Sequence, residues 1–223
     1  MDQVAPAAAC PAKYDPTQVG YLREPCILVD DDDKILGPIS KHDAHWKQGS
    51  LHRAFSVFLF NERDELLLQQ RSSFKITFPL LKTNSCCSHP QYVPNEMDHP
   101  VQGTKVAAMR KLKHELGLDP STKTNVPAHL LMSLVDYVFL LTLTDPQLSV
   151  NPNEVAHVQW VTPSQLNRMF AHDPAQFTPW FRLMVESGLL DKWWLSHRCK
   201  GEPAPDEICI QAFDNALEIK PQR

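Results

Sequence analysis

The chain has 223 residues, of which 43% are hydrophobic and 22% charged, a composition that excludes a disordered or collagen-like protein. Its formal net charge of −4 argues against general nucleic-acid binding but is compatible with a local basic pocket for an anion. The length fits one large domain or two small ones.

The compartment is predicted from the cysteines and from the start of the chain. The six cysteines contain no CxxC pair, and the N-terminal residues lack the basic start and apolar run of a secretory signal. No apolar run approaches the roughly 20 residues of a membrane span. We therefore expect a cytoplasmic protein with reduced thiols and no membrane span, with a peroxisome or plastid left open.

The first third of the chain predicts an arm followed by two hairpins. Residues 1–22 are rich in Pro and Ala and predict a loose N-terminal arm. Two apolar runs, 26–29 and 34–36, flank an acidic turn and predict the first hairpin. The runs 54–60 and 65–71 flank a polar turn and predict the second.

The remaining elements follow in a different order. Residues 72–102 predict an irregular loop of the kind that is usually functional, and 104–116 predict an amphipathic helix. Residues 130–143 predict one or two buried strands, and 155–161 predict another. Two Thr-Pro pairs then begin two helices. Because strands do not alternate with helices, we expect an α+β fold with a mixed or antiparallel sheet.

The predicted domain boundaries follow from this order of elements. A single domain is expected over residues 23–198, followed by a polar tail over 199–223. We expect a monomer that does not bind nucleic acid and has no membrane span.

The stretch Thr83–Pro90 places a thiol two residues before a histidine. In an extended segment alternate side chains share a side, so Cys87 and His89 face one way while Cys86 and Ser88 face the other. Such a pair suits a reactive site. The alternative is a buried structural cysteine beside a hydrogen-bonded histidine.

The predicted helix 104–116 carries a face of small residues beside a charged pair. Lys111 and Glu115 share this face with Ala107 and Ala108, so an anion and a metal ion can approach it closely. The alternative is a solvated i, i+4 ion pair, which the sequence alone favours.

Several separated motifs resemble those of type I isopentenyl-diphosphate delta-isomerases, which belong to the Nudix superfamily. The resemblance covers about residues 25–195 and implies a Nudix-like mixed β-sheet flanked by helices, with N-terminal and C-terminal extensions. The motifs that carry it are Leu51–Asn61, Leu68–Ser72, Thr83–Pro90, Arg110–Gly117 and Thr178–Trp180.

The resemblance implies a 1,3-allylic proton shift between isopentenyl and dimethylallyl diphosphate, a step of isoprenoid biosynthesis. An alkene is protonated to a tertiary carbocation, and a proton then leaves from the other end. Such a site needs an acid and a base, π-electrons near the cation, a metal ion and cations that hold the diphosphate.

The resemblance also assigns roles to residues of this chain. Cys87 matches the catalytic thiol and Trp180 the aromatic ring that faces the carbocation. Glu115 matches a glutamate that helps to bind Mg²⁺ with the substrate diphosphate. The expected ligands of a second divalent ion, Zn²⁺ or Mn²⁺, are His45, His52 and His89. The expected diphosphate-binding residues are Lys41, Arg71, Lys75, Arg110 and Lys111.

One family segment has no counterpart in the chain. The family carries a segment of the form W-G-E-x-E after the helix, and about fifteen residues are missing at this point. Its two glutamates, one a metal ligand and the other a ligand and catalytic acid or base, fall at Met132 and Leu134. Asp136, on the same strand face as Leu134, is a candidate substitute. A splicing or gene-model origin of the gap is an alternative.

Three functional hypotheses follow. The first is an isopentenyl-diphosphate delta-isomerase, and the second is a catalytically impaired homologue that binds the diphosphate or a partner without turnover. The third is a Nudix diphosphohydrolase, which is disfavoured because Arg110–Glu115 holds one glutamate where hydrolases cluster three.

Overall fold

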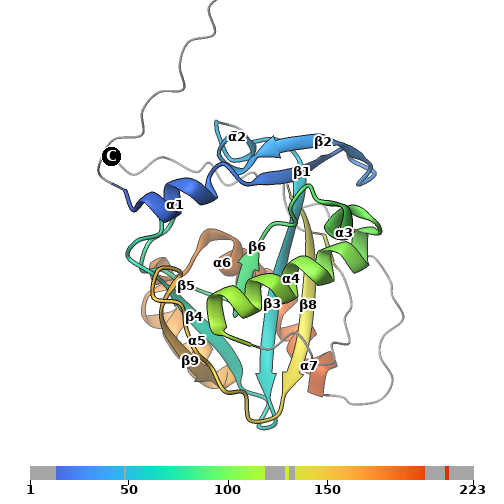
Figure 1. Cartoon of the computed structure of the whole chain (residues 1–223). Coiled ribbons are helices and arrows are strands. Elements are labelled where there is room, and N and C mark those ends of the chain that lie inside the picture. Colours follow the sequence, from blue (N-terminus) through green and yellow to red (C-terminus); the bar gives the residue numbers. More distant parts are fainter. Residues whose placement is uncertain (1–13, 48, 119–128, 131–133, 199–208, 211–223) are drawn as a thin grey trace, which may run out of the picture.

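The computed structural model describes residues 14–47, 49–118, 129–130, 134–198 and 209–210 (Figure 1). No helix among these residues has the length and apolar character to cross a membrane. The predicted tail over 199–223 lies outside the described residues except for Cys209–Ile210.

The main sheet contains eight strands. They are β1 (Pro25–Val29), β2 (Ile35–Ser40), β3 (His52–Asn61), β4 (Leu66–Arg71), β5 (Lys82–Thr83), β6 (Cys86–Ser88), β8 (Leu134–Leu143) and β9 (Val155–Val161). A separate parallel pair joins β7 (His129–Leu130) to β10 (Cys209–Ile210).

The described helices surround this sheet. They are α1 (Pro16–Tyr21), α2 (Lys41–Ala44), α3 (Pro94–Met97), α4 (Pro100–Leu116), α5 (Pro163–His172), the 3₁₀ turn η1 (Pro174–Gln176), α6 (Pro179–Glu186) and α7 (Leu189–Arg198).

Strand β3 organises the sheet. It pairs antiparallel with β1, β4 and β6, and parallel with β8 along its whole length. The sheet is therefore mixed, and the two predicted hairpins, β1–β2 and β3–β4, are both present. The predicted α+β class with a mixed sheet is confirmed.

Helices cover the two faces of the sheet unequally. Helix α4 crosses one face (Figure 1), where Ala107, Leu112 and Leu116 pack against Phe55 and Val57. Helices α5, α6 and α7 pack against the opposite face, in a second apolar cluster that includes Phe58, Val138, Phe181 and Trp193.

Strand alternation assigns the candidate residues to these faces. His52 and Ser56 share a face of β3 with Phe58, because alternate residues of a strand point the same way. Cys86 packs in the cluster under α4 and Cys87 opposes Ser56, so the two cysteines point to opposite faces, as predicted.

Three sequence expectations differ from the structure. Part of the predicted loose arm forms α1, which Asp15 caps by accepting from the backbone N–H groups of Thr17 and Gln18. The predicted loop 72–102 contains β5, β6 and α3, and α4 begins at Pro100 rather than at residue 104. Proline at the first helical position lacks the N–H that a helix start leaves unsatisfied, so α4 extends to it.

Candidate active site

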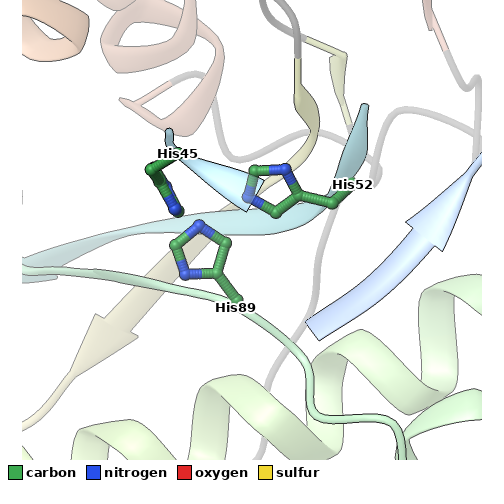
Figure 2. A group of neighbouring side chains, drawn as sticks. All are labelled: His45, His52 and His89. Carbon is green, nitrogen blue, oxygen red and sulfur yellow. The ribbon is translucent and has the colours of Figure 1, made fainter. Parts of the chain in front are cut away.

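Three histidines from separate segments converge at one end of β3. His45 follows α2, His52 opens β3 and His89 follows β6. Their ring centroids lie 4.8–4.9 Å apart, and Figure 2 shows the rings turned toward one another. The structure thus brings together the three predicted metal ligands, and one nitrogen of each lies within 4.8 Å of the others.

Hydrogen bonds to backbone carbonyls fix the orientation of two of these rings. The Nδ1 atoms of His45 and His52 lie 2.8 Å and 2.6 Å from the carbonyl oxygens of Lys41 and Ser50. Donation from Nδ1 leaves the Nε2 lone pair free, which is the usual arrangement of a metal-binding imidazole.

Two nitrogens of the cluster are buried and lack a hydrogen-bond partner in the described part of the chain, while the His45 side chain is exposed. His52 Nε2 and His89 Nδ1 have no hydrogen-bond partner among the described residues. Burial lowers the pKa of His52 to about 4, and it also lowers the pKa of His45 and His89. Neutral imidazoles with free nitrogens suit a divalent transition ion, so the residues present fit such an ion.

Cys87 lies next to this cluster on the same sheet face. It opposes Ser56 across the β3–β6 pair, and its Sγ atom lies 3.8 Å from Ser56 Oγ. Burial raises the pKa of Cys87 to about 12, and the nearby Asp136 carboxyl adds to this effect. The side chain is therefore a neutral thiol at physiological pH, able to donate a proton.

Asp136 is connected to the Cys87 thiol through Ser56 and does not belong to the histidine cluster. Its Oδ2 atom accepts a 2.8 Å hydrogen bond from Ser56 Oγ, and burial raises its pKa to about 7. Asp136 is not among the residues that form the three-histidine group. Leu134, where the resemblance led us to expect a glutamate, lies directly opposite His52.

Trp180 and Arg71 stack beside the Cys/His stretch. Trp180 Nε1 donates to Asn84 Oδ1 at 3.3 Å, and the Arg71 guanidinium carbon lies 5.7 Å from the centre of the indole ring. The Arg71 side chain also donates to the carbonyl oxygens of Thr77 and Phe78. The loop that carries these carbonyls therefore holds the guanidinium in place.

A buried cluster of charges surrounds the last turns of α4. Lys111 Nζ lies 3.1 Å from Glu115 Oε1 and 3.8 Å from Glu154 Oε2, and Lys75 Nζ donates to Glu154 Oε2 at 2.6 Å. The alternative of a solvated Lys111–Glu115 pair is wrong, because both side chains are at least nine-tenths buried. Burial raises the pKa of Glu115, but Lys111 and Lys75 outweigh it and lower the pKa to about 2.

Two of the predicted diphosphate-binding residues, Arg110 and Lys41, form ion pairs outside the charge cluster of α4. Arg110 forms two hydrogen bonds with Glu96, of 2.6 Å and 2.9 Å, and one of 3.5 Å with the carbonyl oxygen of His89. Lys41 lies 3.3 Å from Glu24. The contacts of Arg110 and Lys41 tie them to the histidine side of the site, away from the Lys75–Lys111 cluster.

Sequence reasoning missed Ser56 and Glu154. Ser56 is the only polar residue in the run Phe55–Phe60, and it shares a strand side with His52, a signal that was present in the sequence. Glu154 precedes a strand and carried no such signal. Gln18 of α1 contacts the Glu154 carboxylate at 3.1 Å.

Comparison with known proteins identifies the family. A model described as NUDIX domain matches residues 50–181. An isopentenyl-diphosphate delta-isomerase of Gibberella zeae is 40% identical over 203 residues, which cover 81% of this chain and 79% of that protein. The Schizosaccharomyces pombe isopentenyl-diphosphate delta-isomerase is 40% identical over 220 residues, covering 83% of this chain and 95% of that protein.

A solved structure supports the fold alone. The crystal structure of DR0079 from Deinococcus radiodurans superposes with a TM-score of 0.54 at 20% identity, covering 80% of this chain and all of that one. Both sequence comparisons extend over most of the chain, and the family match includes His52, Cys87 and His89. The chain therefore belongs to the Nudix family and, within it, to the isopentenyl-diphosphate delta-isomerases.

Proposed function

We propose that this protein interconverts isopentenyl diphosphate and dimethylallyl diphosphate. Family membership supports this reaction, and one structural observation indicates which part of the molecule performs it. Cys87 lies on the same sheet face as His52, beside the three-histidine cluster. A thiol and a cluster of this kind, placed together, provide the acid that alkene protonation requires.

Cys87 is the proton donor in this proposal. Its neutral thiol transfers a proton to the terminal alkene carbon, and the π pair of the alkene forms the new C–H bond. The ring of Trp180 stabilises the resulting tertiary cation through its π-electrons. The stacked Arg71 guanidinium and the hydrogen bond to Asn84 hold that ring in position.

The charge cluster around α4 binds the diphosphate in this proposal. Lys75 and Lys111 donate charge-assisted hydrogen bonds to phosphate oxygens, and Arg71 contributes a third positive charge. Glu115 helps to bind Mg²⁺ that enters with the substrate. Lysine at position 111 keeps the charge of a family arginine but not its bidentate geometry. Arg110 and Lys41 would add positive charge from the histidine side of the site, where they pair with Glu96 and Glu24.

His45, His52 and His89 would hold a divalent ion, Zn²⁺ or Mn²⁺. Such an ion supplies local positive charge that orders neighbouring polar groups when it is bound. The histidines themselves supply neutral donor atoms, and backbone hydrogen bonds set the orientation of the His45 and His52 rings. The cytoplasmic location and the monomeric state remain predictions from the sequence.

The test is direct conversion of the substrate. The full chain is incubated with isopentenyl diphosphate, Mg²⁺ and either Zn²⁺ or Mn²⁺, and products are separated by liquid chromatography with mass detection. Dimethylallyl diphosphate that disappears in Cys87→Ala supports the proposal. Released phosphate would indicate a hydrolase, and binding without any product would indicate an impaired homologue; either result refutes the proposal.

A further inference from the structure

The proposed reaction needs a partner for the thiol. Allylic isomerisation adds one proton and removes another, so a site with Cys87 alone lacks a group that restores the thiol's proton. One of the family's carboxylate positions is occupied by Leu134, whose side chain cannot transfer protons. The other falls at Met132, which lies outside the described residues and cannot transfer protons either.

Three adjacent strands place a different carboxyl group beside the thiol. Strand β3 lies between β6 and β8, with Ser56 opposite Cys87 and Ala54 opposite Asp136. Paired residues share a sheet face, and Ala54 and Ser56 are two positions apart, so Cys87, Ser56 and Asp136 project from the same face.

The side chains of these three residues form a continuous chain of contacts. Asp136 Oδ2 lies 2.8 Å from Ser56 Oγ, which lies 3.8 Å from Cys87 Sγ. The single hydroxyl hydrogen of Ser56 can serve only one neighbour at a time. When Asp136 is a carboxylic acid that donates to Ser56 Oγ, the hydroxyl is free to donate to the sulfur.

The environment of Asp136 differs from that of other buried acids. Four carboxylate side chains among the described residues are buried: Glu96, Glu115, Asp136 and Glu154. The three glutamates each pair with a Lys or Arg side chain. Among the described residues, Asp136 has no such ion pair, and its Oδ1 atom is buried without a hydrogen-bond partner there.

An uncompensated buried acid is destabilising, so its presence needs a reason other than stability. Proton transfer is one, because a buried carboxyl group that no cation holds in the ionised form keeps a proton that it can pass to a neighbour. Its direct hydrogen bond to the hydroxyl that contacts Cys87 connects it to the thiol.

We propose that Asp136 is the second proton-transfer group of this site and exchanges protons with Cys87 through the hydroxyl of Ser56; this inference rests on the proposed function. Asp136 is thus a positioning and relay residue, since it acts on the substrate through the thiol.

The proton balance closes over the two half-reactions. As the thiol proton bonds to the alkene carbon, the Ser56 hydroxyl proton moves to Sγ and the Asp136 carboxyl proton moves to Ser56 Oγ. The carbocation and the Asp136 carboxylate are then present together. A proton leaves the carbon next to the cationic centre and bonds to Sγ, and its C–H pair becomes the new double bond. The former thiol proton moves to Ser56 Oγ and the hydroxyl proton moves to the Asp136 carboxylate, so all three groups regain their starting state.

Asp136→Asn tests this role, because the amide keeps the shape and a hydrogen bond to Ser56 but has no carboxyl proton. We expect kcat for isomerisation to fall by about a hundredfold or more with KM little changed, as for the loss of a general acid/base group. Ser56→Ala should lower kcat similarly, and Ser56→Thr, which keeps a hydroxyl, should restore most of it.

Two controls separate this role from a structural one. Tyr137→Phe removes a hydroxyl that donates to Asp33 on the opposite sheet face, away from Cys87, so it should leave kcat of the folded protein unchanged. The melting temperature of Asp136→Asn should equal or exceed that of the wild type, so a slow variant is not an unfolded one. A merely structural hydrogen bond would instead lower the melting temperature and leave kcat of the folded fraction intact.

The outcomes distinguish the two levels of the proposal. A wild-type chain that makes no dimethylallyl diphosphate refutes the proposed function and, with it, the relay. If the wild type converts the substrate and Asp136→Asn lowers kcat by less than threefold, equivalent to about 0.7 kcal/mol, the role of Asp136 alone is refuted.

Discussion

Cys87 and Ser56 occupy directly opposed positions on two hydrogen-bonded strands, β6 and β3. The thiol is therefore positioned by the register of the sheet rather than by a flexible loop. The same register directs Cys86 into the core beneath α4. Two adjacent cysteines thus have separate environments, and this contrast provides a matched test.

Cys87→Ala should abolish isomerisation, while Cys86→Ala should retain it. Loss of a general acid typically lowers the reaction rate by about 10²–10⁴-fold, so the isomerisation rate of Cys87→Ala should fall by at least this factor. Cys86→Ala removes one buried sulfur from the core and should lower the unfolding free energy by about 1 kcal/mol. Steady-state rates and urea unfolding measure the two effects. Equal activity of both variants would contradict the assignment of Cys87.

His52→Ala should weaken metal binding by about tenfold or more, because one neutral donor atom is lost from the cluster. His42→Ala is the control. His42 lies in α2, which ends just before His45, but its ring stacks on Trp46 at the surface. Elemental analysis after dialysis against a weak chelator reports the metal content. Full metal retention in His52→Ala would show that the ion binds elsewhere.

Lys75→Gln should weaken binding of magnesium diphosphate by about tenfold or more, since a charge-assisted hydrogen bond contributes about 1.5–3 kcal/mol. The effect should appear in KM and in the dissociation constant of inorganic pyrophosphate, measured by calorimetry with Mg²⁺. Lys192→Gln, on the exposed side of α7, should bind as the wild type does. Unchanged binding in Lys75→Gln would place the diphosphate outside the α4 cluster.

Asp136 should make the metal-free protein less stable at higher pH. Burial raises the pKa of Asp136 from an ordinary value of 3.8 to about 7. Its contribution to stability is therefore complete below pH 3.8 and is lost as the pH rises through 7. Asp136→Asn has no carboxyl to ionise and does not lose this stability. The difference in unfolding free energy between the variant and the wild type should therefore grow from about pH 4 to pH 8, by on the order of a few kcal/mol. Parallel stability curves for the two proteins would contradict this account.

Asp33→Ala should destabilise the fold strongly. Asp33 pairs with Arg53, whose side chain is almost fully buried, through a 2.7 Å hydrogen bond. Removing the carboxylate leaves a buried charge, at a cost of about 3–5 kcal/mol. The neighbouring Asp32→Ala breaks only an exposed pair with Lys34 and should change stability by less than about 1 kcal/mol. Chemical denaturation measures the unfolding free energy of both variants. Similar losses of stability would contradict the role of Asp33 as the partner of the buried Arg53.

Local patterns predicted much of the fold. Strand alternation places Cys87 and His89 on one side because a strand repeats every two residues. The Thr162 capping box sets the start of α5, as its sequence indicates, because the side chains of Thr162 and Gln165 satisfy backbone groups at the helix end. Both features depend on residues within a few positions of one another.

The features that sequence reasoning missed depend on distant pairing. The parallel contact of β8 with β3 brings Asp136 next to Ser56, which is 80 positions away in the chain. Glu154 and Lys75 meet across 79 positions. The burial of the Lys111–Glu115 pair likewise follows from this long-range packing, so the local i, i+4 spacing predicted a solvated pair instead.

The most direct test of the central claim follows the fate of isopentenyl diphosphate with the wild-type chain. Proton NMR in buffered D₂O with Mg²⁺ and Zn²⁺ should show dimethylallyl diphosphate accumulating to equilibrium, with deuterium incorporated from solvent. The signal should be absent with Cys87→Ala and strongly reduced with Asp136→Asn. An unchanged isopentenyl diphosphate spectrum with the folded, metal-loaded wild-type protein would contradict the account.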